Sequence, residues 1–211
     1  MAEQQADILT AENLQLWRGD RRLFEHLFVE ARPECMVHIQ GANGAGKTSL
    51  MRILCGLASP DEGQVCWRGE RIGRVRSEFQ GMLAYLGHRD GLKHDLSALE
   101  NLRFCCGLQR SVEEVTLRAA LDSAGVGDAA DLPVRFLSAG QRRRVAFARV
   151  TASAAALWLL DEPFANLDAE GTAFVARTVL GHLEHGGLVV MAAHRLPPEL
   201  SAARVAIVTL G

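Results

Sequence analysis

Short apolar runs separated by turn-forming residues fill the first forty positions of the chain. The runs cover residues 8–9, 13–17, 27–29 and 35–39, and Gly19 and Pro33 interrupt the series. Apolar runs of this length, bounded by glycine and proline, predict β-strands. The last run leads directly into a glycine-rich segment, so we expect a strand to end where that segment begins.

A helical pattern starts at Lys47. Apolar residues recur at i, i+3, i+4 and i+7, which places them on one face of a helix. They are Leu50, Ile53, Leu54 and Leu57. Gly56 and Pro60 mark the expected end of this helix. This part of the chain is therefore predicted to run from a strand through a glycine-rich loop into a helix.

The pattern changes over residues 88–136. Two capping boxes, Ser97 with Glu100 and Ser111 with Glu114, each predict the start of a helix. Apolar residues continue a helical pattern after each box. They are Leu99, Leu102, Phe104, Val115, Leu117 and Leu121. We expect a small helical subdomain, inserted into the core at about residues 88–150.

Apolar strands and a helix alternate in the rest of the chain. Strands are predicted at 157–160, 188–193 and 205–210, with a helix at 170–185. Nearly continuous apolar strands that alternate with helices indicate a parallel sheet covered on both faces. No internal repeat or low-complexity linker is visible. The fold class is therefore α/β, and residues 1–211 are expected to form a single domain.

Composition narrows the class of protein. The 211 residues are 48% hydrophobic and 23% charged, which is typical of a folded globular chain. A net charge of −2 gives no reason to expect nucleic acid as a partner. The run at 142–144 is basic, but a short basic run at a helix start is usually a solvated face. The apolar stretches 152–160 and 188–193 fall far below the roughly 18–20 residues of a spanning helix, and the N-terminus has no apolar signal core.

Five cysteines occur, at Cys35, Cys55, Cys66, Cys105 and Cys106. Their number is odd and none forms a CxxC pair, so buried, reduced thiols are expected. The neighbouring pair Cys105 and Cys106 leaves metal or haem binding as an alternative, but the local pattern is helical and no second cluster of ligands lies near.

The glycine-rich segment fits the phosphate-loop pattern G-x-x-x-x-G-K-[ST]. In such a loop consecutive backbone N–H groups and a helix N-terminus converge on one anion. Lys47 can bridge the β- and γ-phosphates, and the Thr48 hydroxyl can bind Mg²⁺. The predicted phosphate-binding residues are Gly41, Ala42, Asn43, Gly44, Ala45, Gly46, Lys47, Thr48 and Ser49.

Four further motifs follow the phosphate loop in a fixed order. They are Leu137–Gln141, the pair Asp161 and Glu162 at the end of an apolar strand, Ala165–Asp168, and His194 after the next apolar strand. A carboxylate at the C-terminal end of such a strand lies where α/β folds bind ligands. The whole series resembles the ATP-binding-cassette (ABC) ATPases, over nearly the entire chain from about residue 8.

The resemblance implies the fold and the chemistry. It implies an ABC-type nucleotide-binding domain, with an antiparallel β subdomain beside the parallel or mixed sheet and the helical insert. It implies ATP and Mg²⁺ as cofactors, with Mg²⁺ held by Thr48 and, through water, by Asp161. Glu162 is implied as the general base that polarises the attacking water, and His194 as the histidine that contacts the γ-phosphate.

The resemblance also implies that two cassettes act together. In the family, the Leu137–Gln141 segment completes the ATP site of a second subunit across a head-to-tail dimer. Its N–H groups and a serine hydroxyl at a helix start favour an anion. The residues implied on this side are Ser138, Ala139, Gly140, Gln141 and Asp168.

Three positions depart from the general pattern or leave it open. His88 stands where a glutamine is usual; its imidazole can accept from water or approach Mg²⁺, with a dependence on pH. Ala139 replaces the first glycine of the usual LSGGQ, which is harmless if its φ is negative and costly if it is positive. Trp17 and Arg18 are the candidates for stacking on adenine, although Trp17 can equally belong to the core.

A chain with one cassette and no span resembles the ATPase subunit of a transporter whose membrane subunits are separate chains. Segments 41–48, 85–88, 137–146 and 161–164 most resemble the haem-exporter ATPases of cytochrome c biogenesis. That likeness implies a cassette homodimer, integral membrane permease partners, a haem chaperone as an indirect partner, and a place at the cytoplasmic face of the inner membrane. Another small-molecule or lipid ABC transporter is the alternative, and a soluble ABC ATPase is the alternative from a different class.

Overall fold

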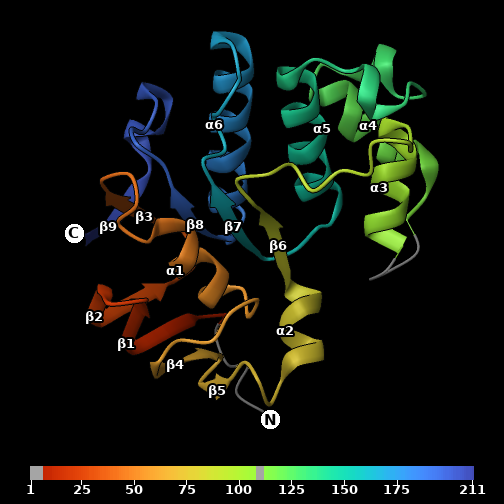
Figure 1. Ribbon diagram of the computed structural model, residues 1–211. Helices are drawn as coiled ribbons and strands as arrows, with labels where there is room; N and C mark the ends of the chain where they lie inside the picture. The colour runs from red at the N-terminus through yellow and green to blue at the C-terminus, as the bar shows by residue number, and fades with distance from the viewer. Residues whose placement is uncertain (1–6, 108–111) are drawn as a thin grey trace.

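A five-stranded parallel sheet forms the centre of the computed structural model, which describes residues 7–107 and 112–211 (Figure 1). The strand order is β6-β7-β8-β3-β9, and every neighbouring pair is parallel. β7 and β8 are buried at every position, as expected for strands covered on both faces. The strands are β3 (Cys35–Gly41), β6 (Leu83–Leu86), β7 (Leu157–Asp161), β8 (Leu188–Ala192) and β9 (Arg204–Leu210).

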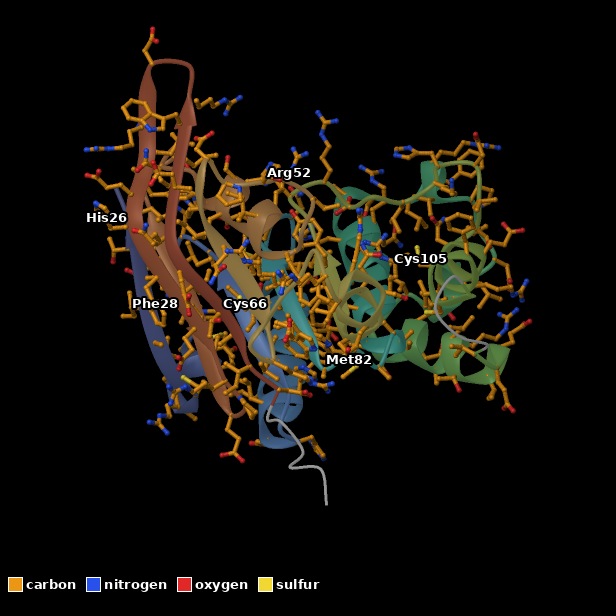
Figure 2. All side chains as sticks on the ribbon, turned by 90° about the horizontal axis from the view of Figure 1, so that it is seen from below. His26, Phe28, Arg52, Cys66, Met82 and Cys105 are labelled. Carbon is orange, nitrogen blue, oxygen red and sulfur yellow. The ribbon has the colours of Figure 1, made fainter. Side chains whose placement is uncertain are left out.

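A second sheet is antiparallel, with the strand order β2-β1-β4-β5. Leu9 and the apolar run at 13–17 lie in one strand, β1 (Leu9–Arg18). This strand continues through a register shift near Asn13, which has a positive φ of 50°. Figure 2 shows the long β1–β2 hairpin, with His26 and Phe28 on its second strand. The strands are β1 (Leu9–Arg18), β2 (Arg21–Ala31), β4 (Glu62–Trp67) and β5 (Glu70–Arg71).

The parallel sheet separates two hydrophobic cores. Leu157 and Leu159 of β7 pack into the core that the antiparallel sheet shares with α1 (Lys47–Leu54). Trp158 and Leu160 pack into the opposite core, with α5 (Ala139–Ala152) and α6 (Ala169–Glu184). Successive side chains of a strand point to opposite faces, so one strand serves both cores.

The inserted helical subdomain contains α3 (Ala98–Gly107), α4 (Glu114–Ser123) and the first part of α5, and lies on the side away from the antiparallel sheet (Figure 1). The capping box at the start of α3 is confirmed: the Ser97 backbone N–H donates to Glu100 over 2.7 Å, and the Glu100 backbone N–H donates to the Ser97 hydroxyl over 3.1 Å. Ser111, the first residue of the second expected box, lies outside the described residues.

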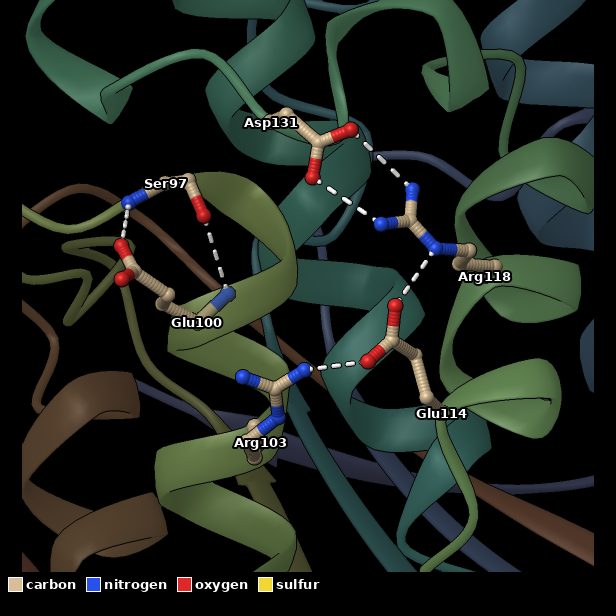
Figure 3. A network of polar contacts seen from close by, with 6 residues as sticks. All are labelled: Ser97, Glu100, Arg103, Glu114, Arg118 and Asp131. Atoms are coloured by element: carbon tan, nitrogen blue, oxygen red, sulfur yellow. Dashed lines mark hydrogen bonds and ion pairs between the residues drawn. The ribbon is translucent and has the colours of Figure 1, made fainter.

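Figure 3 shows how the surface of this subdomain is cross-linked. The carboxylate of Glu114 accepts from Arg103 of α3 at 2.5 Å and from Arg118 of α4 at 2.9 Å. Arg118 also donates to both oxygens of Asp131, each at 3.1 Å. These groups are exposed, so each pair contributes little to stability, but together they fix α3 against α4.

The remaining elements connect these layers. They are α2 (Arg76–Met82) and the 3₁₀ helices η1 (Gly127–Ala129), η2 (Val134–Phe136) and η3 (Pro198–Ala202). Within residues 7–107 and 112–211, no helix has the length and apolar character needed to cross a membrane. The five cysteines, all in the described part of the chain, form no disulfide; Cys35 and Cys105 are partly exposed rather than buried.

Three apolar residues that fit the predicted helical patterns are exposed. α1 ends at Leu54, and Gly56 turns the chain with a φ of 73°, so the i+7 residue Leu57 leaves the helix and is 58% exposed. Phe104 is 46% exposed and Val115 is 67% exposed, because each lies two residues from a buried leucine and therefore on another side of its helix. The helical apolar pattern therefore includes these three positions without burying them.

Candidate functional site

The glycine-rich loop joins the end of β3 to the start of α1. Gly46 is the N-cap residue of α1, with a φ of 104°, and it has no side chain to accept from the first N–H groups of the helix. A Cβ at Gly41 would lie 2.6 Å from the Leu210 carbonyl oxygen, so only glycine fits between the loop and β9. The loop therefore leaves the N-terminus of α1 open to an anion.

Lys47 lies across this loop. Its side chain is largely buried, and its ammonium donates to the carbonyl oxygens of Gly41 at 2.7 Å and Ala42 at 3.2 Å. Thr48 and Ser49 follow in the first turn of α1 and line the same cavity. One positive charge and the start of a helix are thus directed at the same small volume.

Two carboxylates stand at the end of β7, opposite this loop. Asp161 is 1% exposed, and neither of its carboxylate oxygens has a hydrogen-bond partner among the described residues. Glu162 follows with a φ of 51°, in the left-handed region that residues with a Cβ rarely adopt. Its carboxylate lies 3.9 Å from the Nε2 of His194, the residue that follows β8 by two positions.

A cavity of about 490 Å³ opens between these elements, at the C-terminal edge of the parallel sheet. Eleven of the residues that we expected to bind ATP or Mg²⁺ or to act in catalysis line it. Ala165, the first residue of the Ala165–Asp168 motif, and Leu23, which no motif indicated, line it as well. The expected residues are Arg18, Asn43, Gly44, Gly46, Lys47, Thr48, Ser49, His88, Asp161, Glu162 and His194. Five separate segments of the sequence therefore meet around one opening.

The two candidates for stacking on adenine are placed differently. Arg18 lines the cavity, whereas Trp17 does not; the Trp17 ring is 44% exposed, and the Arg22 guanidinium lies 5.7 Å from its centre. Leu23 forms the apolar part of the wall beside Arg18. It was missed because a leucine in a strand has no pattern that separates a ligand contact from a core contact.

The segment after Leu137 starts α5 and lies outside the cavity of its own chain. Ser138 is the N-cap residue: its hydroxyl accepts from the Gln141 backbone N–H at 3.2 Å, and its own backbone N–H donates to the Gln141 side chain at 2.8 Å. Ala139 has a negative φ, so its Cβ causes no backbone strain, as expected. A Cβ at Gly140 would lie 2.9 Å from the Asn166 carbonyl oxygen, so glycine is needed there for close approach.

Asp168 caps α6 and also lies outside the cavity of its own chain. Its carboxylate accepts from the Gly171 backbone N–H at 2.9 Å and from Arg144 at 2.7 Å. The Gly171 N–H and then the Arg144 guanidinium hold the pKa of this carboxyl below its usual value. In a single chain, Asp168 is thus the cap of a helix and not a contact of the cavity.

The basic run at 142–144 is not a solvated face, so that interpretation was wrong. Arg142 donates to the Leu137 carbonyl at 2.6 Å, and Arg144 reaches Asp168. Arg143 is only 1% exposed. Its guanidinium donates to backbone carbonyls that border the cavity and to Asp90 at 3.2 Å. Burial lowers the pKa of Arg143 more than these partners raise it.

The donor set fits Mg²⁺ bound together with a nucleotide. The buried, unpartnered oxygens of Asp161 form an acceptor group directed at the cavity that also holds Thr48. No cluster of three or more His, Cys, Asp or Glu side chains suited to a metal occurs among the residues the structure describes. Mg²⁺ needs no such cluster, because it usually keeps several waters and takes only one or two protein ligands besides substrate phosphates.

Comparison with known proteins gives the family. The profile of the ABC transporter family matches residues 24–165. The chain is 41% identical over 190 residues to the "Cytochrome c biogenesis ATP-binding export protein CcmA" of Nitrosomonas europaea, covering 90% of this chain and 89% of that protein. A protein of the same name from Aromatoleum aromaticum is 45% identical over 193 residues, with 90% of each chain covered.

Solved structures agree on the fold. An ATP-binding subunit of an ABC transporter superimposes with a TM-score of 0.87 at 21% identity, over 96% of this chain and 85% of that one. A bacterial Atm1-family ABC exporter with ATP bound gives a TM-score of 0.83 at 22% identity, over 98% of this chain and 38% of that one. The chain therefore belongs to the ABC transporter family and, within it, to the cytochrome c biogenesis ATP-binding export proteins.

Proposed function

We propose that this chain hydrolyses ATP in the cavity at the C-terminal edge of the parallel sheet, and that this hydrolysis drives a membrane transporter for cytochrome c biogenesis. The observation that carries the proposal is the convergence of Lys47, Asp161 and Glu162 around one opening. A phosphate loop alone would support only nucleotide binding. The carboxylate pair at the end of β7 adds the means to activate water.

Binding follows from the groups at the loop. The backbone N–H groups from Gly44 to Thr48 and the Lys47 ammonium suit the β- and γ-phosphates, and Arg18 suits the base. Asp161 and Thr48 would hold Mg²⁺, which when bound neutralises charge on the phosphates. Because Lys47 already lies over the loop carbonyls, only a short movement of its ammonium is needed to meet an incoming phosphate.

Hydrolysis needs a base and a group that orients the water. Glu162 supplies the carboxylate that polarises the attacking water and accepts its proton. His194, 3.9 Å from that carboxylate, is placed to orient the same water and the γ-phosphate. His88 enters the cavity from the loop after β6 and takes the position that a glutamine has in most of the family.

Two copies of the chain complete each site. Ser138, Gly140 and Asp168 lie outside the cavity of their own chain, so they are free to face the ATP of a second copy. The Ser138 hydroxyl oxygen accepts the capping hydrogen bond from the Gln141 backbone N–H. Its proton remains available to donate to a phosphate of the second copy's ATP. A head-to-tail homodimer would thereby close two ATP molecules between two cassettes.

The biological role rests on the relatives. Proteins named as cytochrome c biogenesis ATP-binding export proteins align along 88–90% of this chain in the first five of them. We therefore assign the chain to a complex with integral membrane permease subunits, at the cytoplasmic face of the inner membrane. Haem is the proposed cargo or co-substrate, and release of a haem-loaded chaperone is the proposed output.

One experiment tests both parts. A tagged Glu162→Gln chain is recovered from mild-detergent membranes with ATP present, and its partners are identified by mass spectrometry. Amide in place of carboxylate keeps the shape of the site but removes the base, so ATP stays bound and turnover falls by about 10²–10⁴-fold. Two polytopic membrane proteins and a haem-bearing chaperone are expected to co-purify.

The other outcomes are equally informative. Recovery of a different permease would keep the ATPase role and overturn the assignment to cytochrome c biogenesis. Recovery of only soluble proteins would overturn the transporter role. ATP turnover at the parent rate in the Glu162→Gln chain would overturn Glu162 as the base.

A further inference from the structure

Arg143 is a charged side chain next to the cavity that is as deeply buried as Asp161, at 1% exposure. It projects from α5 toward the ends of β6 and β7. Its Nη1 donates to the Gly87 carbonyl at 2.9 Å and to Asp90 at 3.2 Å. Its Nη2 donates to the carbonyls of Asp161 at 2.8 Å and Glu162 at 2.6 Å.

These contacts require a guanidinium. Arginine presents its donors as a rigid planar fork, so its two terminal nitrogens can each serve two acceptors at once. A lysine ammonium is a point charge with three donors, and a glutamine amide has one nitrogen and no charge. Burying a charge is unfavourable unless it is well partnered, so Arg143 is held there by these four acceptors. Its Nε has no hydrogen-bond partner among the described residues, so the two terminal nitrogens make all four of these contacts.

The four acceptors belong to two segments of the site. Gly87 directly precedes His88, and Asp90 follows it by two residues. Asp161 and Glu162 end the neighbouring strand, where Glu162 has its unusual φ of 51°. One side chain therefore holds the backbone carbonyl of Gly87 before His88 and the side-chain carboxylate of Asp90 after it. At the same time it holds the backbone carbonyl of Glu162, the residue proposed as base.

We propose that Arg143 is a positioning residue that sets the distance between His88 and Glu162 across the ATP site. The inference rests on the proposed roles of those two residues. Arg143 itself does not line the cavity. Its effect on hydrolysis is carried by the His88 loop, which would lose its attachment to the end of β7 without the guanidinium.

The test measures ATP hydrolysis by the full complex in membranes with Arg143→Gln, Arg143→Lys and Arg149→Gln chains. Arg149 is the matched control: it lies on the same helix and donates to the Gly91 carbonyl of the same loop at 3.2 Å, but it does not reach β7. When catalytic groups are displaced, turnover falls more than substrate binding. Arg143→Gln is therefore expected to lower kcat about 10–100-fold. The KM for ATP should stay within about twofold of the parent value.

Arg143→Lys keeps the buried positive charge, but an ammonium cannot serve both segments as the planar guanidinium does, so its kcat should fall as well. A parent-like kcat in both Arg143 variants would overturn the proposal. So would an equal loss in Arg149→Gln, because that result would mean a general effect of charge on α5.

A double-mutant cycle with His88→Ala separates positioning from a merely structural role. If Arg143 acts through His88, Arg143→Gln should lower kcat by less than about threefold in the His88→Ala background. A full loss in both backgrounds, or parent-like turnover in His88→Ala alone, would refute the positioning role. Glu162→Gln is assayed in parallel: normal turnover there would overturn the proposed function, whereas stalled Glu162→Gln with active Arg143→Gln would overturn only this inference.

Discussion

Two helices of this cassette begin with sequences suited to an anion, yet their N-termini are built in opposite ways. α1 begins after Gly46, whose lack of a side chain leaves the first N–H groups to the cavity. α5 begins after Ser138, which closes its own N-terminus through a reciprocal capping box with Gln141. The first N-terminus is open within a single chain, and the second is satisfied without any ligand.

The difference separates the tasks of the two segments. An uncapped helix start is stabilised by the ligand that it binds, so the phosphate loop gains its last hydrogen bonds only from ATP. A capped helix start is stable by itself and can be presented to another chain as a rigid surface. In our proposal, the second copy would then meet a preformed α5 N-terminus, with the Ser138 proton still available.

The largest expected effect comes from removing the charge at the open N-terminus. Lys47→Ala should weaken ATP binding by at least about 100-fold, because charge-assisted hydrogen bonds contribute about 1.5–3 kcal/mol each. Stability without ATP should change less than ATP binding, since the hydrogen bonds of the ammonium go to two carbonyls of the same loop and to no distant segment. Titration calorimetry with ATP and thermal unfolding without it measure the two effects. An unchanged Kd would contradict the assignment of the phosphate loop.

A smaller effect is expected at the closed N-terminus, where two variants separate the cap from the catalytic contact. Ser138→Ala should cost about 1 kcal/mol of stability through loss of the cap, and should lower ATP turnover. Ser138→Asp should retain the stability, because aspartate is as good an N-cap residue as serine. Its negative charge should nevertheless prevent approach to a phosphate, so turnover should stay low.

Thermal unfolding and ATP hydrolysis of the assembled complex decide between these cases. Parent-like turnover in Ser138→Asp would mean that Ser138 serves only as a cap. Low stability in both variants would mean that the reciprocal bonds with Gln141 are not the main support of α5.

The smallest effect is expected at the N-terminus of α6, which is capped by the charged side chain of Asp168. The folded-state pKa of Asp168 lies below its ordinary value of 3.8, so its ionised form stabilises the fold above that pH. This contribution is lost as the pH falls through the lowered folded-state pKa. Asp168→Asn keeps an N-cap without the charge, so the difference in Tm between parent and variant should shrink between pH 7 and pH 3. A constant difference would rule out a role for the charge.

The order of motifs made much of the site predictable from sequence. A phosphate loop after an apolar run, and carboxylates or a histidine after the next runs, all fall at one edge of a parallel sheet, because the C-terminal ends of parallel strands share that edge. Lys47, Asp161 and His194 line one cavity for that reason. The α/β class and the helical insert followed from the same periodicity.

The parts that sequence did not predict depend on contacts between distant segments. Arg143 reads as one of three adjacent surface arginines, and only the folded chain brings the carbonyls of Gly87 and Glu162 to it. Leu57 fits the helical period, but the turn at Gly56 removes it from the helix. Periodicity describes one element at a time, whereas these outcomes depend on where an element ends and what lies opposite.

The left-handed conformation of Glu162 has an evolutionary consequence. A residue with a Cβ costs about 1–2 kcal/mol in that conformation, whereas glycine adopts it freely and asparagine tolerates it. Selection for stability alone would therefore favour glycine or asparagine at this position. Glutamate is kept there because its carboxylate is needed as the proposed base. A descendant cassette with either residue here would have given up hydrolysis and gained a more stable fold.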